Sequence, residues 1–206
     1  MSKLRLSLVV AGIAFVPPSH AVMIGGVEFP DGATSFADEA VEFSPGPDVE
    51  KSWLDPTNAL GVPDSSGTSL GDDGSLTLQF TDNALTTSGD SNEDLWVFEG
   101  GPVVENFGVA VSTDNSSWID LGVVSGQPSG IDLDAVAGVT QGASYSYVKL
   151  TDAPPNQSGL PYGEADIDAV GAISSAPPVN SVPEPGSLAL FGLGLTALGL
   201  GSRRRG

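Results

Sequence analysis

The sequence predicts an all-β protein, with one β-sandwich domain between two short, apolar, helical ends. Short segments alternate apolar and polar residues, and clusters of Gly, Pro, Asp and Ser separate them. Before residue 186 no long stretch repeats apolar residues every 3.6 positions, as an amphipathic helix would. About seven to nine short strands are typical of a jelly-roll-like sandwich or of a related sandwich topology, which strand number does not distinguish.

The strand pattern can be followed along the chain. The expected strands are 40–43, 75–80, 95–98, 107–112, 118–124, 145–150 and 166–173. Leu76, Leu78 and Phe80 fall on one face of their segment, whereas 95–98 is apolar on both faces and is expected to be central. Residues 113–116 (Thr-Asp-Asn-Ser) have the composition of a hairpin turn.

The N-terminal segment has the pattern of a secretory signal peptide, residues 1–21. Lys3 and Arg5 precede an apolar stretch, and Ser19-His20-Ala21 places small residues at the cleavage positions. We expect signal peptidase to cut after Ala21. The domain is then expected over residues 22–175, and 176–181 reads as an extended linker.

The C-terminal segment, 182–206, has three parts. Val182-Pro183-Glu184-Pro185 is followed by an uncharged stretch over 186–202 and by Arg203, Arg204 and Arg205. The stretch is near the minimum length for a transmembrane helix, and the arginines favour the cytoplasm. This pattern resembles the PEP-CTERM sorting signal, which implies a transient anchor in the inner membrane and processing by an exosortase. The protein would then reach the cell surface or the extracellular matrix.

The mature chain is strongly acidic and lacks several reactive residue types. Residues 22–183 contain 25 acidic residues and two basic ones, Lys51 and Lys149; the chain has no Cys, and its one His lies in the signal peptide. Histidine-based nucleophilic catalysis and His or Cys zinc sites therefore have no residues to use. The acidic chain would repel nucleic acid. The sequence contains no phosphate-binding loop before a helix, so we do not expect it to bind a nucleotide. Carboxylate-pair catalysis and cation binding by oxygen ligands stay open.

Several motifs in the body resemble segments of surface proteins that carry the same sorting tail. They are 55–64 (DPTNALGVPD), 69–71 (SLG), 76–80 (LTLQF), 94–99 (DLWVFE) and 165–170 (ADIDAV). Such proteins are similar to galactose-binding-like, discoidin-type jelly rolls and to carbohydrate-binding modules. That resemblance implies a last strand with a buried aspartate beside a structural calcium ion, and Asp168 holds the corresponding place.

The candidate metal ligands follow from this strand. Asp166 and Asp168 are two residues apart, so both side chains are expected on one face, where a cation would offset their repulsion. Asp38 or Glu39 would complete the site. Glu99 ends a buried strand and would either bind metal or accept hydrogen bonds from backbone amides. Alternatively, these carboxylates are surface charge, with Asp168 capping a turn.

The acidic segment 90–94 begins like an EF-hand loop but departs from that pattern. Leu95 stands where the loop needs glycine, and Gly101 where it needs a bidentate glutamate. We therefore expect a plain acidic loop there.

Two aromatic residues are candidates for contact with a glycan. Trp53 and Tyr162 lie in loop-like sequence, where a ring can stack on a sugar, although burial of Trp53 against a loop is the alternative; Trp96 and Trp118 are expected in the core. The leading function is a non-catalytic, calcium-stabilised surface protein that contacts exopolysaccharide. The alternatives are a glycan-cleaving enzyme with two carboxylates and an acidic coat or adhesion protein without a specific ligand.

Overall fold

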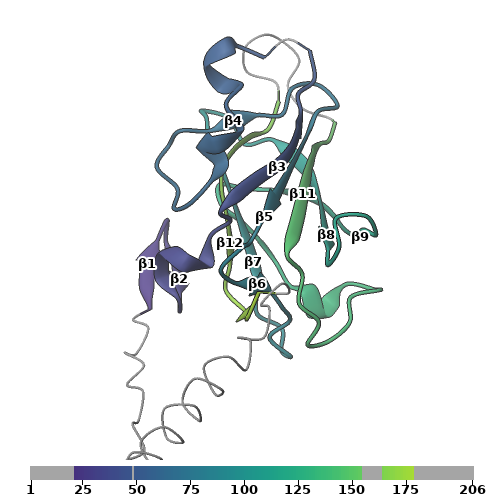
Figure 1. Ribbon diagram of the computed structural model, residues 1–206. Helices are drawn as coiled ribbons and strands as arrows, with labels where there is room; N and C mark the ends of the chain where they lie inside the picture. Colours follow the sequence, from purple (N-terminus) through teal and green to yellow (C-terminus); the bar gives the residue numbers. More distant parts are fainter. Residues whose placement is uncertain (1–20, 48, 155–163, 179–206) are drawn as a thin grey trace, which may run out of the picture.

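Two antiparallel sheets packed face to face form the body of the protein in the computed structural model, which describes residues 21–47, 49–154 and 164–178 (Figure 1). The larger sheet has the order β3-β5-β11-β8-β9. Its strands are β3 (Glu39–Ser44), β5 (Ser75–Gln79), β11 (Tyr147–Asp152), β8 (Asn106–Ser112) and β9 (Ile119–Ser125). The smaller sheet, β10-β7-β12-β4, covers its inner face.

The smaller sheet contains the strand that the sequence marks as central. Its members are β10 (Ser129–Ile131), β7 (Leu95–Glu99), β12 (Asp166–Ala172) and β4 (Thr68–Ser69). Leu95 and Val97 of β7 face the core between the sheets, whereas Trp96 and Phe98 pack in a second apolar cluster on the outer face. The prediction that this strand is covered on both faces is confirmed.

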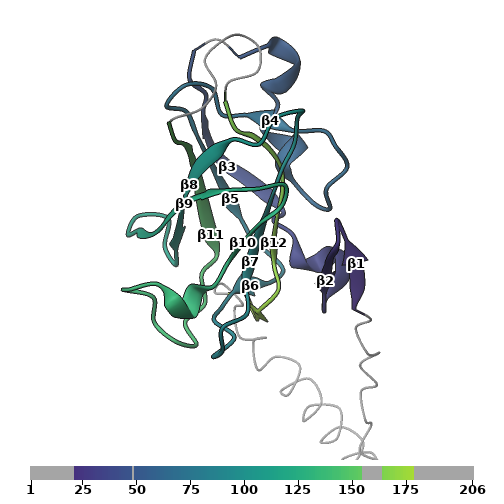
Figure 2. The same ribbon diagram turned by 180° about the vertical axis from the view of Figure 1, so that it is seen from behind.

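An N-terminal hairpin covers part of the outer face of the smaller sheet. It consists of β1 (Val22–Ile24) and β2 (Val27–Phe29), seen at the edge of the molecule in Figures 1 and 2. Phe29 and Phe36 pack with Phe98. The ring centroids of Phe29 and Phe36 are 4.6 Å apart. A Cβ at Gly171 would lie 2.6 Å from the Phe29 ring, so this close approach requires glycine there.

The main core follows from period-two alternation. Leu76, Leu78 and Phe80 are at most 1% exposed, as their spacing predicts. The hairpin turn between β8 and β9 is also as expected. The Asp114 carboxylate accepts hydrogen bonds from the amides of Ser116 and Ser117, at 2.9 and 2.8 Å, and these bonds lower its pKa.

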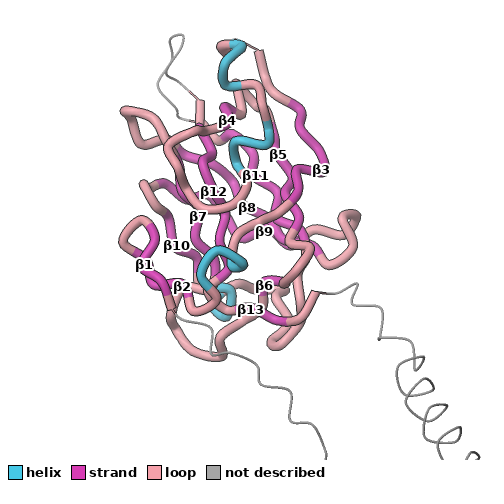
Figure 3. The backbone as a smooth tube through the Cα atoms, turned by 60° about the vertical axis from the view of Figure 1, so that its left-hand side comes forward, coloured by secondary structure: helices cyan, strands magenta, loops and turns pink. Residues whose placement is uncertain are grey.

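The remaining elements are short. They are β6 (Ala84–Leu85), β13 (Ser175–Ala176) and four 3₁₀ turns: η1 (Gly32–Ser35), η2 (Lys51–Trp53), η3 (Pro56–Ala59) and η4 (Leu133–Ala135). Figure 3 shows these turns in the connections around the sheets. Within the described ranges, no helix is long and apolar enough to cross a membrane. The expected signal-peptide helix and the expected membrane helix over 186–202 lie outside those ranges.

Two tryptophans expected in the core are only half-buried. Trp96 borders the outer cluster, and Trp118 precedes β9, with the ammonium of Lys149 4.3 Å from its ring centroid. Both expectations were wrong in part, because Trp96 lies on the outer face of the smaller sheet and Trp118 lies just before β9 rather than between the sheets.

Candidate functional site

Strand ends from both sheets bring five acidic residues to one end of the sandwich. Antiparallel pairing places Glu99, the last residue of β7, opposite Ile167 at the start of β12, and places Asp152, the last residue of β11, opposite Phe107 at the start of β8. We call these residues the acidic cluster: Glu99, Glu105, Asp152, Glu164 and Asp166. Four of them are at most 8% exposed, and Asp166 is half-buried. Burial of so many carboxyl groups is unusual unless protons or cations neutralise them.

The environment of the cluster favours protonated carboxyl groups. Burial raises the pKa of Glu99 to about 8; the nearby Gln127 amide opposes this rise, and Glu105 and Asp166 add to it. Burial, followed by the charges of Asp166, Glu164 and Asp152, raises the pKa of Glu105 to about 8. At neutral pH both side chains are therefore mainly neutral.

Asp166 differs from its neighbours in charge. Burial raises its pKa to about 6, and a hydrogen bond from Ser69 opposes that rise. The group is thus mainly ionised at pH 7. The cluster combines neutral carboxyl groups with at least one carboxylate, an arrangement that can donate and accept hydrogen bonds.

Glu99 stands out because neither carboxyl oxygen has a hydrogen-bond partner among the described residues. The Gln127 amide donates instead to the carbonyls of Gly100, Gly101 and Val103, at 2.9, 3.2 and 3.1 Å. Hydrogen bonds from backbone amides, one of the two roles that the sequence offers for Glu99, are not formed at either carboxyl oxygen. An unsatisfied buried carboxyl group costs stability and needs a functional or structural reason.

A cavity beside the acidic cluster opens next to Trp53. Its volume is about 250 Å³. We call it the Trp53 pocket, and its lining is Val49, Glu50, Trp53, Ser69, Pro102, Glu164 and Asp166. Trp53 also borders a second, more open hollow with Ser52, Asn58, Ser65, Ser66 and Gly67. The tryptophan side chain is thus shared between two concave surfaces.

The position of Trp53 depends on local backbone. It ends η2, where its amide donates to the carbonyl of Glu50 at 2.9 Å. A Cβ at Gly67 would lie 2.9 Å from the indole ring, so the ring packs directly on that glycine. Trp53 is therefore half-buried. One side of its ring packs against the loop, as one sequence-based alternative expected, and the ring also lines a cavity, as a sugar platform would. The other predicted platform, Tyr162, lies outside the described residues.

The predicted metal ligands are not brought together. Asp38 accepts bonds from the amide and hydroxyl of Thr81, at 2.7 and 3.0 Å, next to the far end of β5. Both oxygens of Asp168 accept backbone amides, from Asp64 and Ser65, each at 3.1 Å. Asp168 thus caps the 64–65 turn, which is the alternative that the sequence left open.

Strand register explains why the predicted metal ligands lie apart. Ala37 bonds to Val170, four residues beyond Asp166 on β12, so Asp38 lies roughly 13 Å along the sheet from Asp166. A bulge between Ile167 and Ala169 also turns Asp168 toward the 64–65 turn. Asp38, Asp166 and Asp168 therefore do not fit a shared calcium ion.

Glu99 and Glu39 were the less favoured candidates for metal ligands, and one of the two lies in the acidic cluster. Glu99 belongs to the acidic cluster with Asp166, whereas Glu39 is exposed on β3. Glu105 was missed by sequence reasoning because it lies just before β8 in a segment without a strand or turn motif. No local signal identifies it, since its partners come from the ends of three other strands, β7, β11 and β12.

The comparisons with known proteins identify the C-terminal segment. Residues 181–205 match the PEP-CTERM protein-sorting motif. The match supports an exported surface protein that an exosortase processes. No curated protein and no solved structure matches the chain, so the discoidin-type resemblance of the body stays a prediction.

Proposed function

We propose that this protein is a non-catalytic component of the cell surface or extracellular matrix, which contacts exopolysaccharide through the Trp53 pocket. The observation that carries the proposal is the position of Trp53 in a cavity with Glu164 and Asp166. Aromatic rings pack on the CH face of a sugar, and carboxylates accept hydrogen bonds from its hydroxyl groups. The pocket combines both kinds of contact.

The sorting motif supports a location where such a ligand is present. We infer that signal peptidase removes residues 1–21 and that the C-terminal segment anchors the protein in the inner membrane until exosortase cuts near Pro183-Glu184-Pro185. The sandwich is then released toward the matrix. A sugar-binding pocket is useful there, because it can retain a protein that has lost its anchor.

The cluster itself also suggests a carboxylate-dependent, glycan-cleaving enzyme, which is the second candidate. A neutral acid and an ionised carboxylate are the pair that such chemistry uses. However, Glu99 and Glu105, the two groups with a pKa near 8, do not line the pocket, which exposes only Glu164 and Asp166 from the cluster. A bound sugar would not reach the neutral acids, and this favours binding without cleavage.

The test is binding of the full-length protein, in mild detergent, to exopolysaccharide from its own cells. We expect Trp53→Ala to weaken binding by about tenfold, the loss that corresponds to one stacking contact of roughly 1.4 kcal/mol. Trp53→Phe should retain much of the affinity, because it keeps an aromatic face. Isothermal titration or affinity electrophoresis measures both.

Trp118→Ala is the matched control, since Trp118 is a half-buried tryptophan just before β9 that does not line the pocket. Equal losses in the two alanine variants would contradict the proposed pocket. Absence of binding by the wild-type protein would favour a coat protein without a specific ligand. Release of reducing sugar ends, abolished by Asp166→Asn, would favour the enzyme.

A further inference from the structure

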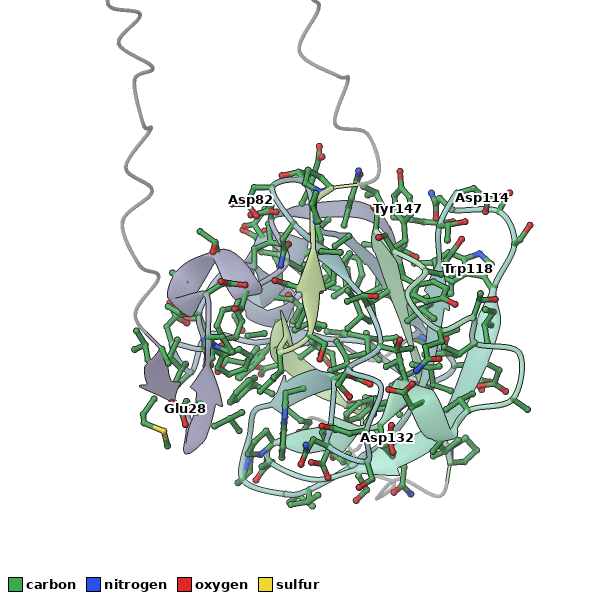
Figure 4. The ribbon with its side chains drawn as sticks, turned by 90° about the horizontal axis from the view of Figure 1, so that it is seen from below. Glu28, Asp82, Asp114, Trp118, Asp132 and Tyr147 are labelled. Atoms are coloured by element: carbon green, nitrogen blue, oxygen red, sulfur yellow. The ribbon has the colours of Figure 1, made fainter. Side chains whose placement is uncertain are left out.

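A second group of carboxylates lies at the opposite end of β7 from the acidic cluster. One carboxylate oxygen from each of Asp94, Asp132 and Asp134 lies within 4.8 Å of the other two. Asp94 precedes β7 and Glu99 ends it, so the two groups are roughly 16 Å apart along the strand. Figure 4 looks onto this end of the molecule and shows Asp132 well apart from Asp82 and Asp114.

Strand pairing and one helical turn assemble this three-aspartate cluster. Ile131 of β10 pairs with Leu95 of β7, and the amide of Asp94 donates to the carbonyl of Ile131 at 2.9 Å. The residues that follow and precede this pair, Asp132 and Asp94, are therefore neighbours. Asp132 caps η4, which carries Asp134 back toward them.

Each aspartate is oriented by a backbone amide on one oxygen. Asp94 Oδ2 accepts from Leu133 at 2.9 Å, and Asp132 Oδ1 accepts from Asp134 at 2.9 Å. Asp134 Oδ2 accepts from Gly89 at 2.8 Å, which ties the 88–94 loop to η4. This arrangement fixes three carboxylates and leaves each a second oxygen for another partner.

The second oxygen of Asp94 indicates what that partner is. Asp94 is 0% exposed, and its Oδ1 has no hydrogen-bond partner among the described residues. A buried carboxylate oxygen without a donor, in a group of three acids, is strongly unfavourable unless a proton or a cation neutralises the group, and a cation can serve all three acids at once. The chain has few cations to offer, because Lys51 and Lys149 are the basic residues within the described ranges and Lys149 lies over Trp118.

We propose that Asp94, Asp132 and Asp134 bind a divalent cation of calcium type, which joins the 88–94 loop to η4. Oxygens bound to one calcium ion at about 2.3–2.6 Å are at most about 5 Å apart, which agrees with the spacing of these three. Carboxylate ligands supplied by irregular loops suit calcium, which accepts flexible geometry, better than magnesium. This site differs from the calcium site that the sequence predicts around Asp166 and Asp168, and it is independent of the Trp53 pocket.

Calcium titration of the full-length protein, in mild detergent after treatment with EDTA, tests the proposal. We expect one site with a Kd of about 10⁻⁴–10⁻³ M, the range of extracellular modules, and a rise in melting temperature of about 3–6 °C at saturation. Asp132→Asn should weaken binding at least tenfold, since the amide oxygen keeps the bond from Asp134 but removes a charge. Asp94→Asn should have a similar effect.

Two variants serve as matched controls. Asp55 caps η3 through the amide of Thr57, as Asp132 caps η4, so Asp55→Asn changes an equivalent capping residue outside the cluster. Asp166→Asn changes the sequence-predicted site. Both should bind calcium as the wild type does. Failure of the wild-type protein to bind calcium at 10 mM (about ten times the weakest expected Kd) would overturn the proposal, as would loss in Asp166→Asn without loss in Asp132→Asn.

Discussion

At the scale of single residues, the most informative side chain is Glu99. It is 6% exposed, it has no hydrogen-bond partner among the described residues, and burial raises its pKa to about 8. The sequence places it correctly at the end of a buried strand. Its neutral form could not be predicted, because it depends first on how completely the folded protein buries the carboxyl group and then on the charges of Glu105 and Asp166, which approach it only in the fold.

Because the pKa of Glu99 is raised in the folded protein, we expect the free energy of unfolding to fall as pH rises. Its pKa is about 8 in the folded chain and near 4.5 when unfolded, so its stabilising effect is complete below pH 4.5 and is lost as pH rises through 8. Glu99→Gln keeps the neutral shape, and we expect it to raise the melting temperature at pH 8 by about 2–6 °C. At pH 5 the variant should match the wild type.

Thermal unfolding from pH 5 to 8 measures this effect, with the exposed Glu28→Gln as the control. A Glu99→Gln variant that is less stable than the wild type at pH 8 would contradict the prediction. That result would mean that the ionised carboxylate is stabilised in the fold, for instance by a bound cation.

At the scale of elements, close backbone contacts decide how the loops meet the sheets. The amide of Gly46, after β3, donates to the carbonyl of Leu70 at 2.8 Å. Gly74 precedes β5 in a turn that the sequence marks by its composition, and its carbonyl accepts from Asp152 at 2.9 Å. The composition of 71–74 predicted the turn. The hydrogen bond from Gly46 to Leu70 joins segments that are distant in the sequence, so it could not be predicted.

Gly74→Ala tests this contact. The added Cβ would lie 1.7 Å from the carbonyl oxygen of Leu70, so the backbone must move. We expect a loss in melting temperature of more than about 5 °C, because strain at a backbone contact is among the few causes of large destabilisation. Gly108→Ala is the control, since its nearest neighbour, the Thr151 carbonyl, is 3.8 Å away. Similar losses in both variants would contradict the prediction, because the loss at residue 74 would then not come from the close contact with Leu70.

At the scale of the whole molecule, the two proposed sites lie at opposite ends of the sandwich. The amide of Ile173, just after β12, donates to the carbonyl of Asp94 at 2.7 Å, so the C-terminal end of β12 lies beside the three-aspartate cluster. The Trp53 pocket lies at the far end, near η2. With the C-terminal segment as the proposed membrane anchor, we therefore expect the pocket to face away from the membrane.

The sorting motif makes a prediction for the whole chain. Replacing Pro183, Glu184 and Pro185 with alanine should leave an unprocessed precursor in the membrane fraction, because the exosortase would lose its recognition sequence. Cell fractionation and immunoblotting measure the size and location of the product. Alanine at Pro177 and Pro178, in the linker, should have no effect. Normal release of the Pro183-Glu184-Pro185 variant would contradict a role of the motif in sorting.

The sequence by itself determined the features that depend on local pattern. Alternation of apolar residues predicted the main strands and the buried faces of Leu76, Leu78 and Phe80, and the Pro-Glu-Pro segment predicted the sorting motif at 181–205. These features are encoded in neighbouring residues. Fold class and destination could therefore be predicted without any knowledge of long-range contacts.

Only the tertiary structure decided which carboxylates meet. Sequence spacing grouped Asp166 with Asp168, but a bulge in β12 directs Asp168 to the 64–65 turn. Strand register placed Asp38 elsewhere, and it brought Asp94 and Asp132, 38 residues apart in the chain, to one end of β7. The physical reason is that a site assembles across strands, where a shift of one residue reverses the direction of a side chain.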